Sequence, residues 1–401
     1  MYWSTDKLFG YLSIRRIMKR DRFMKIQQYL HLNDRSKMKP RNHVDYDKLF
    51  LVRPVLDIVR NLCKQNYNPN QNVSVDEAMV KFRGRLAFRQ YLPAKPTKYG
   101  IKVWMRADPT NGYVNDLQVY TGRENNRTEH GLAHRVVTDL VKDINGHNHI
   151  VNVDNYFTSP QLFEELLNNG TYARGTVRKN RKGFPQAQLK PKDVKIQGDF
   201  KFAKKGDLLA CLWMDKKPIY TLSTAEDPAV IDSSVIRKCR NGDVKEVQAP
   251  SVIPAYNMNM NGVDHADQLR SAYSTFRTSR RWWLYLFWFL WDTAVTNGFI
   301  LMKESIHHQR QTKNNKPKPR TLIDFRSNLA KQLIGDYKEN DLATLATMNV
   351  GHFPTNSDKR GRCRQCSKTK RRHECMSKCL ECNVHICIPC FKDWHMDLIK
   401  M

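Results

Sequence analysis

The stretches VSVDEAMVKF (73–82) and HIVNVDNYF (149–157) have the apolar, β-branched composition of strands, and each carries one aspartate. Asp76 lies inside the first stretch, and Asp154 lies at the end of the second. If the two strands are neighbours in a sheet, the two carboxylates face one another from adjacent strand ends. The sequence therefore predicts an α/β core in which two acidic groups meet at one edge of a sheet.

The segments around these strands alternate between strand and helix patterns. Apolar residues follow helical spacing in 131–144, and Ser159 before Pro160 predicts the start of a helix that ends at Gly170. Further strand patterns are YGIKVWMRAD (99–108), YVNDLQVYTG (113–122) and TYARGTVR (171–178), with the turn sequence PTNG (109–112) between the first two. This order of strands and helices is typical of a ribonuclease-H-like plan, a mixed sheet with helices on its faces.

Helical patterns flank this core on both sides. Residues 12–32 and 46–66 predict helices before it, and a helical pattern resumes at Asn261 and continues to about Arg310. Residues 179–250 are basic and strand-like with Gly and Asp turns, so we expect either a small β insertion or a continuation of the sheet.

One aromatic segment, 282–302, has to be distinguished from a membrane span. Its purely apolar part, WWLYLFWFLW (282–291), is ten residues long, and Asp292 and Asn297 interrupt the rest of the segment. A span needs roughly twenty mostly apolar residues. We therefore expect a buried core helix and no membrane partner.

The composition indicates a polyanionic partner. The 401 residues predict two to four domains, and the 40% hydrophobic content is enough to form cores. The net charge of +29 is spread along the chain, which favours nucleic acid as the partner. The first residues, MYWSTDKLFG, lack the build of a signal peptide.

Two further aspartates join the first pair as candidates. Asp264 and Asp267 are three residues apart in NGVDHADQ, so on a helix they share one face. Clustered carboxylates repel one another unless a hard dication lies between them. Two such ions about 4 Å apart can activate an attacking oxygen and stabilise the leaving oxygen in phosphodiester transfer. We expect Mg²⁺, or Mn²⁺ in its place.

The C-terminal end predicts a zinc-binding module. Seven of the ten cysteines lie between Cys363 and Cys390, a clustering typical of metal ligands and not of a disulfide framework. Six paired cysteines and two histidines supply eight ligands, enough for two cross-braced tetrahedral sites. His373 and Cys375 are alternatives to His385. The eight predicted ligands are Cys363, Cys366, Cys379, Cys382, His385, Cys387, Cys390 and His395.

Residues 359–372 hold eight basic and no acidic residues, a pattern that suits DNA phosphates or a nuclear-import signal. A rival interpretation of the module is a RING- or PHD-like protein-interaction domain with chromatin partners. That rival predicts partner binding by 356–401 alone, without DNA.

Several blocks together resemble the piggyBac family of transposases and their domesticated host relatives. They run in the family's order over nearly the whole chain. The blocks are YWST (2–5), MKRDRFMKIQQYLHLND (18–34), SVDEAMVKFRGRLAFRQYLPAKPTKYGIKVW (74–104), VDNYFTS (153–159), ARGTVRKNRKG (173–183), NGVDHADQLRSAY (261–273) and SRRWW (279–283).

This resemblance implies roles and a domain plan. The family's catalytic aspartates fall on Asp76, Asp154 and Asp264, with Asp267 as a fourth acidic residue. The implied plan is a helical dimerisation and DNA-binding domain in two parts, a ribonuclease-H-like catalytic domain in two parts, an insertion and the zinc module. In chain order the boundaries are 1–70, 71–180, 181–252, 253–274, 275–350 and 356–401.

The resemblance also implies an activity, metal-dependent DNA strand cleavage and transfer. Its substrates would be double-stranded DNA at transposon ends and at TTAA target sites, and the protein would act as a homodimer in the nucleus. The zinc module would help to recognise end DNA. Family members carry a long acidic N-terminal region, so the helical domain is expected to be N-terminally truncated. The alternative is a domesticated, catalytically silent DNA- or chromatin-binding protein.

Overall fold

The computed structural model describes residues 2–6, 8–93, 95–123, 129, 131–228, 230, 233–238, 242–315, 319–335, 352 and 354–400. The chain forms two compact units, and each is described by itself. The large unit is Leu30–Ser327, and the small unit combines Met1–Tyr29 with Asn328–Met401. The part of the predicted second helical domain at 336–350 lies outside the described residues.

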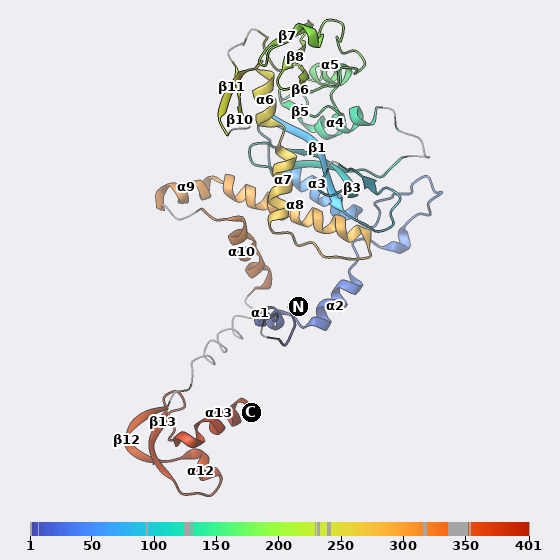
Figure 1. Ribbon diagram of the computed structural model, residues 1–401. Coiled ribbons are helices and arrows are strands. Elements are labelled where there is room, and N and C mark those ends of the chain that lie inside the picture. The colour runs from blue at the N-terminus through green and yellow to red at the C-terminus, as the bar shows by residue number, and fades with distance from the viewer. Residues whose placement is uncertain are drawn as a thin grey trace. The chain divides into compact units, whose positions relative to one another are not determined.

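A nine-stranded mixed sheet forms the large unit's core, as the sequence predicts (Figure 1). The strand order is β2-β3-β1-β5-β6-β9-β8-β7, with β4 paired to β3. Only β1–β5 and β5–β6 are parallel among these pairs. The strands are β1 (Asn72–Lys81), β2 (Gln90–Tyr91), β3 (Tyr99–Ala107), β4 (Val114–Val119), β5 (Ile150–Val153), β6 (Tyr172–Thr176), β7 (Phe200–Lys205), β8 (Leu208–Met214) and β9 (Pro218–Ser223).

Helices cover both faces of this sheet. On one face, α4 (Leu132–Val141) and α5 (Pro160–Asn168) pack against Val73 and Val75 of β1. On the other, α3 (Arg53–Gln65), α7 (Gly262–Ala272) and α8 (Trp282–Glu304) pack against Ala78 and Val80. Figure 1 shows α4 beside β5, and α7 and α8 beside β1 and β3. Because side chains alternate along a strand, Asp76 belongs to the face of Ala78 and Val80.

The aromatic helix α8 is a core helix. Among the described residues it is the one helix long and apolar enough to cross a membrane. However, 67% of its most apolar stretch is buried inside the structure. The polar residues that interrupt it are anchors. Asn297 exchanges hydrogen bonds with the backbone of Val114, at 3.0 and 2.9 Å, and the Asp292 carboxylate accepts one from the hydroxyl of Thr275.

The basic segment after β6 is mostly a continuation of the sheet, because β7, β8 and β9 extend it beyond β6. A separate hairpin, β10 (Ser234–Lys238) with β11 (Val244–Gln248), packs with α6 (Val252–Asn259) and Trp213. The indole of Trp213 donates to the carbonyl of Gln248 at 2.9 Å.

The predicted N-terminal helices are shorter than their apolar patterns. The pattern at 12–32 forms α1 (Leu12–Ile17) and α2 (Arg20–Tyr29), which are separated at Met18. The pattern at 46–66 becomes helical only from Arg53, because Pro54 lacks an N–H group and fits the first turn of a helix but not its interior. The short 3₁₀ turns are η1 (Arg35–Lys37), η2 (Lys142–Ile144) and η3 (Pro191–Asp193), and the remaining helices before the C-terminal module are α9 (Ile306–Asn315) and α10 (Leu322–Ile334).

The C-terminal module has a core made largely of cysteine side chains. Its hairpin pairs β12 (Pro354–Arg362) with β13 (Glu374–Cys379). The helical elements are α12 (Arg364–Lys368), η5 (Ile388–Cys390) and α13 (Phe391–Lys400).

Replacing Gly262 by alanine should destabilise the large unit. A Cβ there would lie 2.4 Å from Ser74 Oγ and 3.0 Å from the carbonyl oxygen of Ala107, so α7 would have to move away from β1. Overpacking of this kind costs about 1–3 kcal/mol, and thermal unfolding should show a lower Tm.

The matched control is Gly298→Ala in α8, where the nearest atom to the new Cβ is Phe325 Cζ at 3.5 Å, an ordinary contact. Alanine favours a helix over glycine, so the Tm should stay the same or rise. A wild-type Tm for Gly262→Ala would contradict the close approach of α7 to β1.

Candidate active site

The parallel register of β1 and β5 brings the first two aspartates to one edge. Val75 pairs with Val153, so Asp76 and Asp154 are the next residues on adjacent parallel strands. Strand β5 ends at Val153, and β1 continues to Lys81. Asp76 is therefore the first residue of β1 beyond its partner strand.

Asp154 begins a tight turn between β5 and α5. Its carboxylate accepts the N–H of Tyr156 at 2.9 Å, and its carbonyl accepts the Thr158 hydroxyl at 2.8 Å. Burial raises the pKa of the Asp154 carboxyl, opposed by hydrogen bonds from backbone N–H groups. The aspartate is thus held mainly by its own turn, and the charge of Lys102 also lowers its pKa.

Asp76 is the most strongly perturbed carboxyl of the edge. Burial is the largest cause and raises its pKa to about 7, while the charge of Lys95 opposes the shift. Glu77 and Asp154 add like charge and raise the pKa further. Carboxyls perturbed by burial and by neighbouring acids are common at functional sites.

Lys95 and Glu77 complete the cluster, and neither was predicted from the sequence. The Lys95 ammonium lies 3.9 Å from Asp76 Oδ2 and 3.7 Å from Glu77 Oε1, and it donates to the Glu77 carbonyl at 3.1 Å. Burial opposes the charge on Lys95, but Asp76, Glu77, Asp264 and Asp267 together outweigh it and raise the pKa of Lys95. Spacing gave no signal for Lys95, because it lies on a loop nineteen residues after Asp76.

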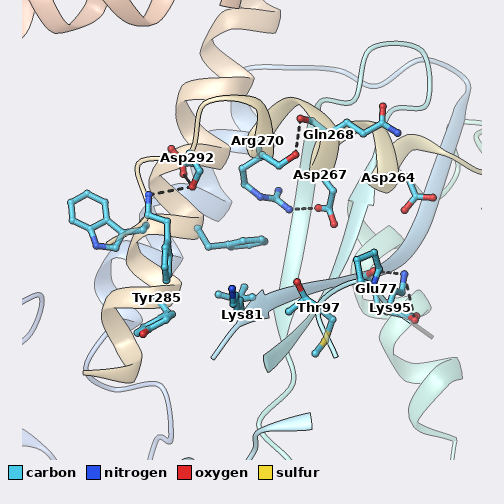
Figure 2. A pocket seen from close by; sticks show the side chains of 18 residues that line it. Glu77, Lys81, Lys95, Thr97, Asp264, Asp267, Gln268, Arg270, Tyr285 and Asp292 are labelled. Atoms are coloured by element: carbon cyan, nitrogen blue, oxygen red, sulfur yellow. Dashed lines mark hydrogen bonds and ion pairs between the residues drawn. The ribbon is translucent and has the colours of Figure 1, made fainter. Parts of the chain in front are cut away.

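Asp264 and Asp267 enter the site from α7, which the close contact at Gly262 holds against β1. With Glu77 and Lys95 they line one end of a cavity of about 780 Å³. Figure 2 shows the four side chains at this end and an ion pair between Arg270 and Asp267. Burial raises the pKa of Asp267 even though Arg270 opposes the shift. Asp267 is thus already paired, whereas Asp264 is exposed in the first turn of α7.

Other acidic residues near the sheet have structural partners. The buried carboxylate of Asp116 lies 2.7 Å from Arg60, and the more exposed carboxylate of Asp143 lies 2.7 Å from the buried Arg106. Asp108 accepts the hydroxyl of Tyr67 and the N–H of Asn70. These acids fasten loops and helices to the sheet, which distinguishes them from the edge cluster.

The donor set of the cluster suits a hard dication, because carboxylate oxygens are the preferred ligands of Mg²⁺ and Mn²⁺. The carboxylate oxygens of the cluster lie too far apart to coordinate a single ion together. In the described ranges, the groups of three or more Cys, His, Asp or Glu ligand atoms within 4.8 Å of one another contain cysteines and histidines alone. Binding one ion would require the acidic side chains to close around it, with Lys95 displaced.

The cysteine-rich module holds two such groups. One comprises Cys363, Cys366, Cys387 and Cys390, and the other comprises His352, Cys379, Cys382 and His395. Sulfur atoms in the first group lie 3.5–3.8 Å apart. A tetrahedron with Zn–S bonds of about 2.3 Å has edges of about 3.8 Å, so this geometry is consistent with zinc.

Local contacts prepare these ligands. Burial opposes ionisation of the Cys363 thiol, but hydrogen bonds from the N–H groups and thiols of Cys366 and Cys387 together outweigh it and lower its pKa to about 7. The Nδ1 atom of His395 is hydrogen-bonded to the carbonyl oxygen of Phe391 at 2.6 Å. The other ring nitrogen, Nε2, therefore faces Cys382 Sγ at 3.5 Å. The ligand pairs alternate between the groups along the chain, which is a cross-braced arrangement.

The ligand set predicted from the sequence needs one correction, because His385 belongs to neither group. Its Nε2 lies 3.0 Å from the carbonyl of Lys359, and its ring packs so closely on β12 that a Cβ at Gly361 would lie 2.4 Å from Nδ1. His352 occupies the eighth position instead, 3.3 Å from both Cys379 and Cys382. The alternatives His373 and Cys375 are also outside both groups.

A mixed sheet with one acidic residue within a strand, a second just after the parallel neighbouring strand and a third on a packed helix defines a ribonuclease-H-like α/β core. The chain belongs to the transposase family described as Transposase IS4, whose family model matches residues 1–299. Within that family it is piggyBac-like, as its relatives show.

The human PiggyBac transposable element-derived protein 3 is 25% identical over 423 aligned residues, which cover 99% of this chain and 66% of that protein. The human PiggyBac transposable element-derived protein 5 is 24% identical over 350 residues, or 83% of this chain and 63% of that protein. The chain thus spans just under two thirds of these curated relatives.

Among solved structures, the cryo-EM structure of a piggyBac transposase synaptic complex with hairpin DNA is similar to this fold. Its TM-score is 0.70 and its identity is 27%, with 96% of this chain and 84% of that chain covered. The likeness extends over nearly the whole chain and supports the same α/β plan.

Replacing Asp76 by asparagine should stabilise the protein at pH 8, without added divalent cation, by about 1–3 kcal/mol. The folded-state pKa of about 7 exceeds the ordinary 3.8, so the folded protein binds more protons than the unfolded chain between those values. Stability therefore falls as pH rises through this window. Asparagine is neutral throughout, so the gain should shrink at pH 5.

Thermal unfolding of both proteins at pH 5, 6, 7 and 8 measures this effect. Asp139→Asn, on an exposed surface of α4, is the matched control and should show no such trend. A gain for Asp76→Asn that is equal at pH 5 and pH 8 would show that burial does not perturb this carboxyl.

Replacing His352 by alanine should lower the zinc content of the purified protein from two ions per chain to about one. His385→Ala should leave it at two, because that ring contacts a carbonyl and not the sulfur groups. Elemental mass spectrometry measures both. Equal zinc loss in the two variants would argue against the ligand assignment.

Proposed function

We propose that this protein is a metal-dependent DNA transposase of piggyBac type that cuts and joins DNA strands. The observation that carries the proposal is the register of β1 and β5, which brings Asp76 and Asp154 to one edge where α7 presents Asp264. These three aspartates would hold Mg²⁺ or Mn²⁺. Asp267, paired with Arg270, would support them as a fourth acidic residue.

The bound ions would supply Lewis acidity for phosphodiester transfer. The protein's own residues set the geometry. The turn after β5 orients Asp154, the contact at Gly262 fixes the start of α7, and Lys95 offsets part of the negative charge while no ion is bound. The neighbouring cavity of about 780 Å³ leaves room for a substrate segment beside Asp264.

The substrate would be double-stranded DNA at transposon ends and TTAA target sites, bound by a homodimer in the nucleus. A net charge of +29 suits this polyanionic partner. The similar piggyBac structure is a synaptic complex with hairpin DNA, which supports DNA as the partner of this chain. The zinc module, with its basic residues at 359–372, would contact the end DNA or chromatin partners.

A catalytically silent DNA- or chromatin-binding protein on the same scaffold is the second candidate. The observation that favours it is the distance between the acidic oxygens, which do not form a ligand group among the described residues. The two candidates differ in one respect: only the first requires metal-dependent cleavage.

Replacing Asp154 by asparagine should reduce Mg²⁺-dependent cleavage of DNA bearing transposon ends by at least about a hundredfold. The substitution removes one negative oxygen donor from the edge and should leave DNA binding intact. Cleavage on a sequencing gel and binding by fluorescence anisotropy measure the two properties separately.

The matched control is again Asp139→Asn, which makes the same chemical change at an exposed helix position paired with Arg135. It should cleave like the wild type. A wild-type protein that binds this DNA but does not cut it with Mg²⁺ or Mn²⁺ would favour the silent scaffold.

A further inference from the structure

We propose that a basic groove of the large unit binds the sugar–phosphate backbone of duplex DNA. The groove has a volume of about 1200 Å³ and is formed by residues from three segments, 35–51, 85–90 and 120–123, together with Trp282. This inference rests on the proposed DNA substrate. It assigns a binding surface distinct from the acidic edge, because no carboxylate of that edge lines the groove.

The charge of the groove is the first argument. Six cationic side chains line it, and no Asp or Glu is present among its described lining residues. Five of the six are exposed, and none of the five forms an ion pair with a carboxylate of the described chain. The six are Arg35, Lys39, Arg41, Lys48, Arg85 and Arg123. Cations gathered without counter-charges repel one another, so a polyanion that lies among them is favoured.

The shape of the groove is fixed by internal contacts. The Lys48 ammonium donates to the carbonyls of Thr121 at 2.9 Å and Arg123 at 3.4 Å, which ties the first segment to the third, just after β4. The second segment is anchored by Phe88, which is buried and packs edge-on against Trp282 with ring centroids 5.4 Å apart. The exposed cations therefore extend from a preformed frame.

The third segment approaches the second closely at Gly122. This glycine has a φ of +84°, and a Cβ on it would lie 3.2 Å from Phe88 Cβ. Only a residue without a side chain fits this approach without strain. Two of the backbone segments that line the groove thus contact one another closely.

A DNA backbone fits these features better than a small anion. The cations come from separate segments around a groove larger than the roughly 300–1,000 Å³ of small-molecule pockets. A row of phosphates can engage several of them at once, and most protein–DNA hydrogen bonds go to the backbone. The loop that carries Arg85 follows β1 directly, so the second segment of the groove and Asp76 lie on one continuous stretch of chain.

The test is the full-length double variant Arg41→Gln/Arg85→Gln, made in the Asp154→Asn background. Binding to a fluorescent 30-base-pair duplex is measured by anisotropy at several KCl concentrations without added divalent cation. Two lost phosphate contacts should lower the slope of log K against log salt by about 1.8 and weaken binding about tenfold at low salt. The control Lys216→Gln/Lys217→Gln removes the same charge from an exposed turn outside the groove and should change Kd less than twofold.

Equal losses in the groove and control variants would overturn the proposal, because the effect would then be diffuse attraction. Unchanged binding of the groove variant would also overturn it. Tighter groove-dependent binding of single-stranded DNA of equal length would overturn the assignment to duplex. Wild-type cleavage with Mg²⁺ is measured in parallel. Absent cleavage with groove-dependent binding would remove the proposed enzyme activity and leave the groove assignment standing.

Discussion

The parallel pairing of β1 with β5 is the constraint on which the site depends. Parallel neighbours cannot be joined by a tight turn, so the chain between them must cross over the sheet. That crossover contains β2, β3, β4 and α4, which supply one wing of the sheet and the cover of one face. Because β5 ends at Val153 while β1 continues, the pairing also creates an open edge at the two aspartates.

The acidic residues at this edge lower the stability of the fold when no metal ion is bound. Four carboxylates surround one ammonium, and burial raises the pKa of two of them, Asp76 and Asp267. Acids elsewhere in the sheet, such as Asp116 and Asp143, are neutralised by arginine at hydrogen-bond distance. The edge cluster has a weaker internal counter-charge. A bound cation should therefore stabilise the edge cluster more than it would stabilise any of those ion pairs.

Much of the architecture could be predicted from the sequence. Strand and helix patterns predict the mixed sheet, and the alternation in β1 shows which face Asp76 occupies. The prediction failed where a single residue decides the outcome. Pro54 delays the start of α3 within a longer apolar pattern. Lys95 reaches the site from a loop, and no periodicity relates a loop residue to a strand residue distant in sequence. His385 lies between two CxxC pairs, yet its ring packs on β12. His352, which precedes the hairpin, is the fourth ligand of the second group instead.

The interleaved cysteine and histidine groups limit how the C-terminal module can be divided. The residues of one group enclose those of the other along the chain, since His352 precedes Cys363 and His395 follows Cys390. A proteolytic fragment that starts at residue 356 would therefore keep all four cysteines of the first group but only three ligands of the second. The shortest fragment that keeps all eight ligands extends from His352 to His395. Cleavage of the chain at any point between these two histidines would either separate ligands of both groups or remove one histidine from the second group.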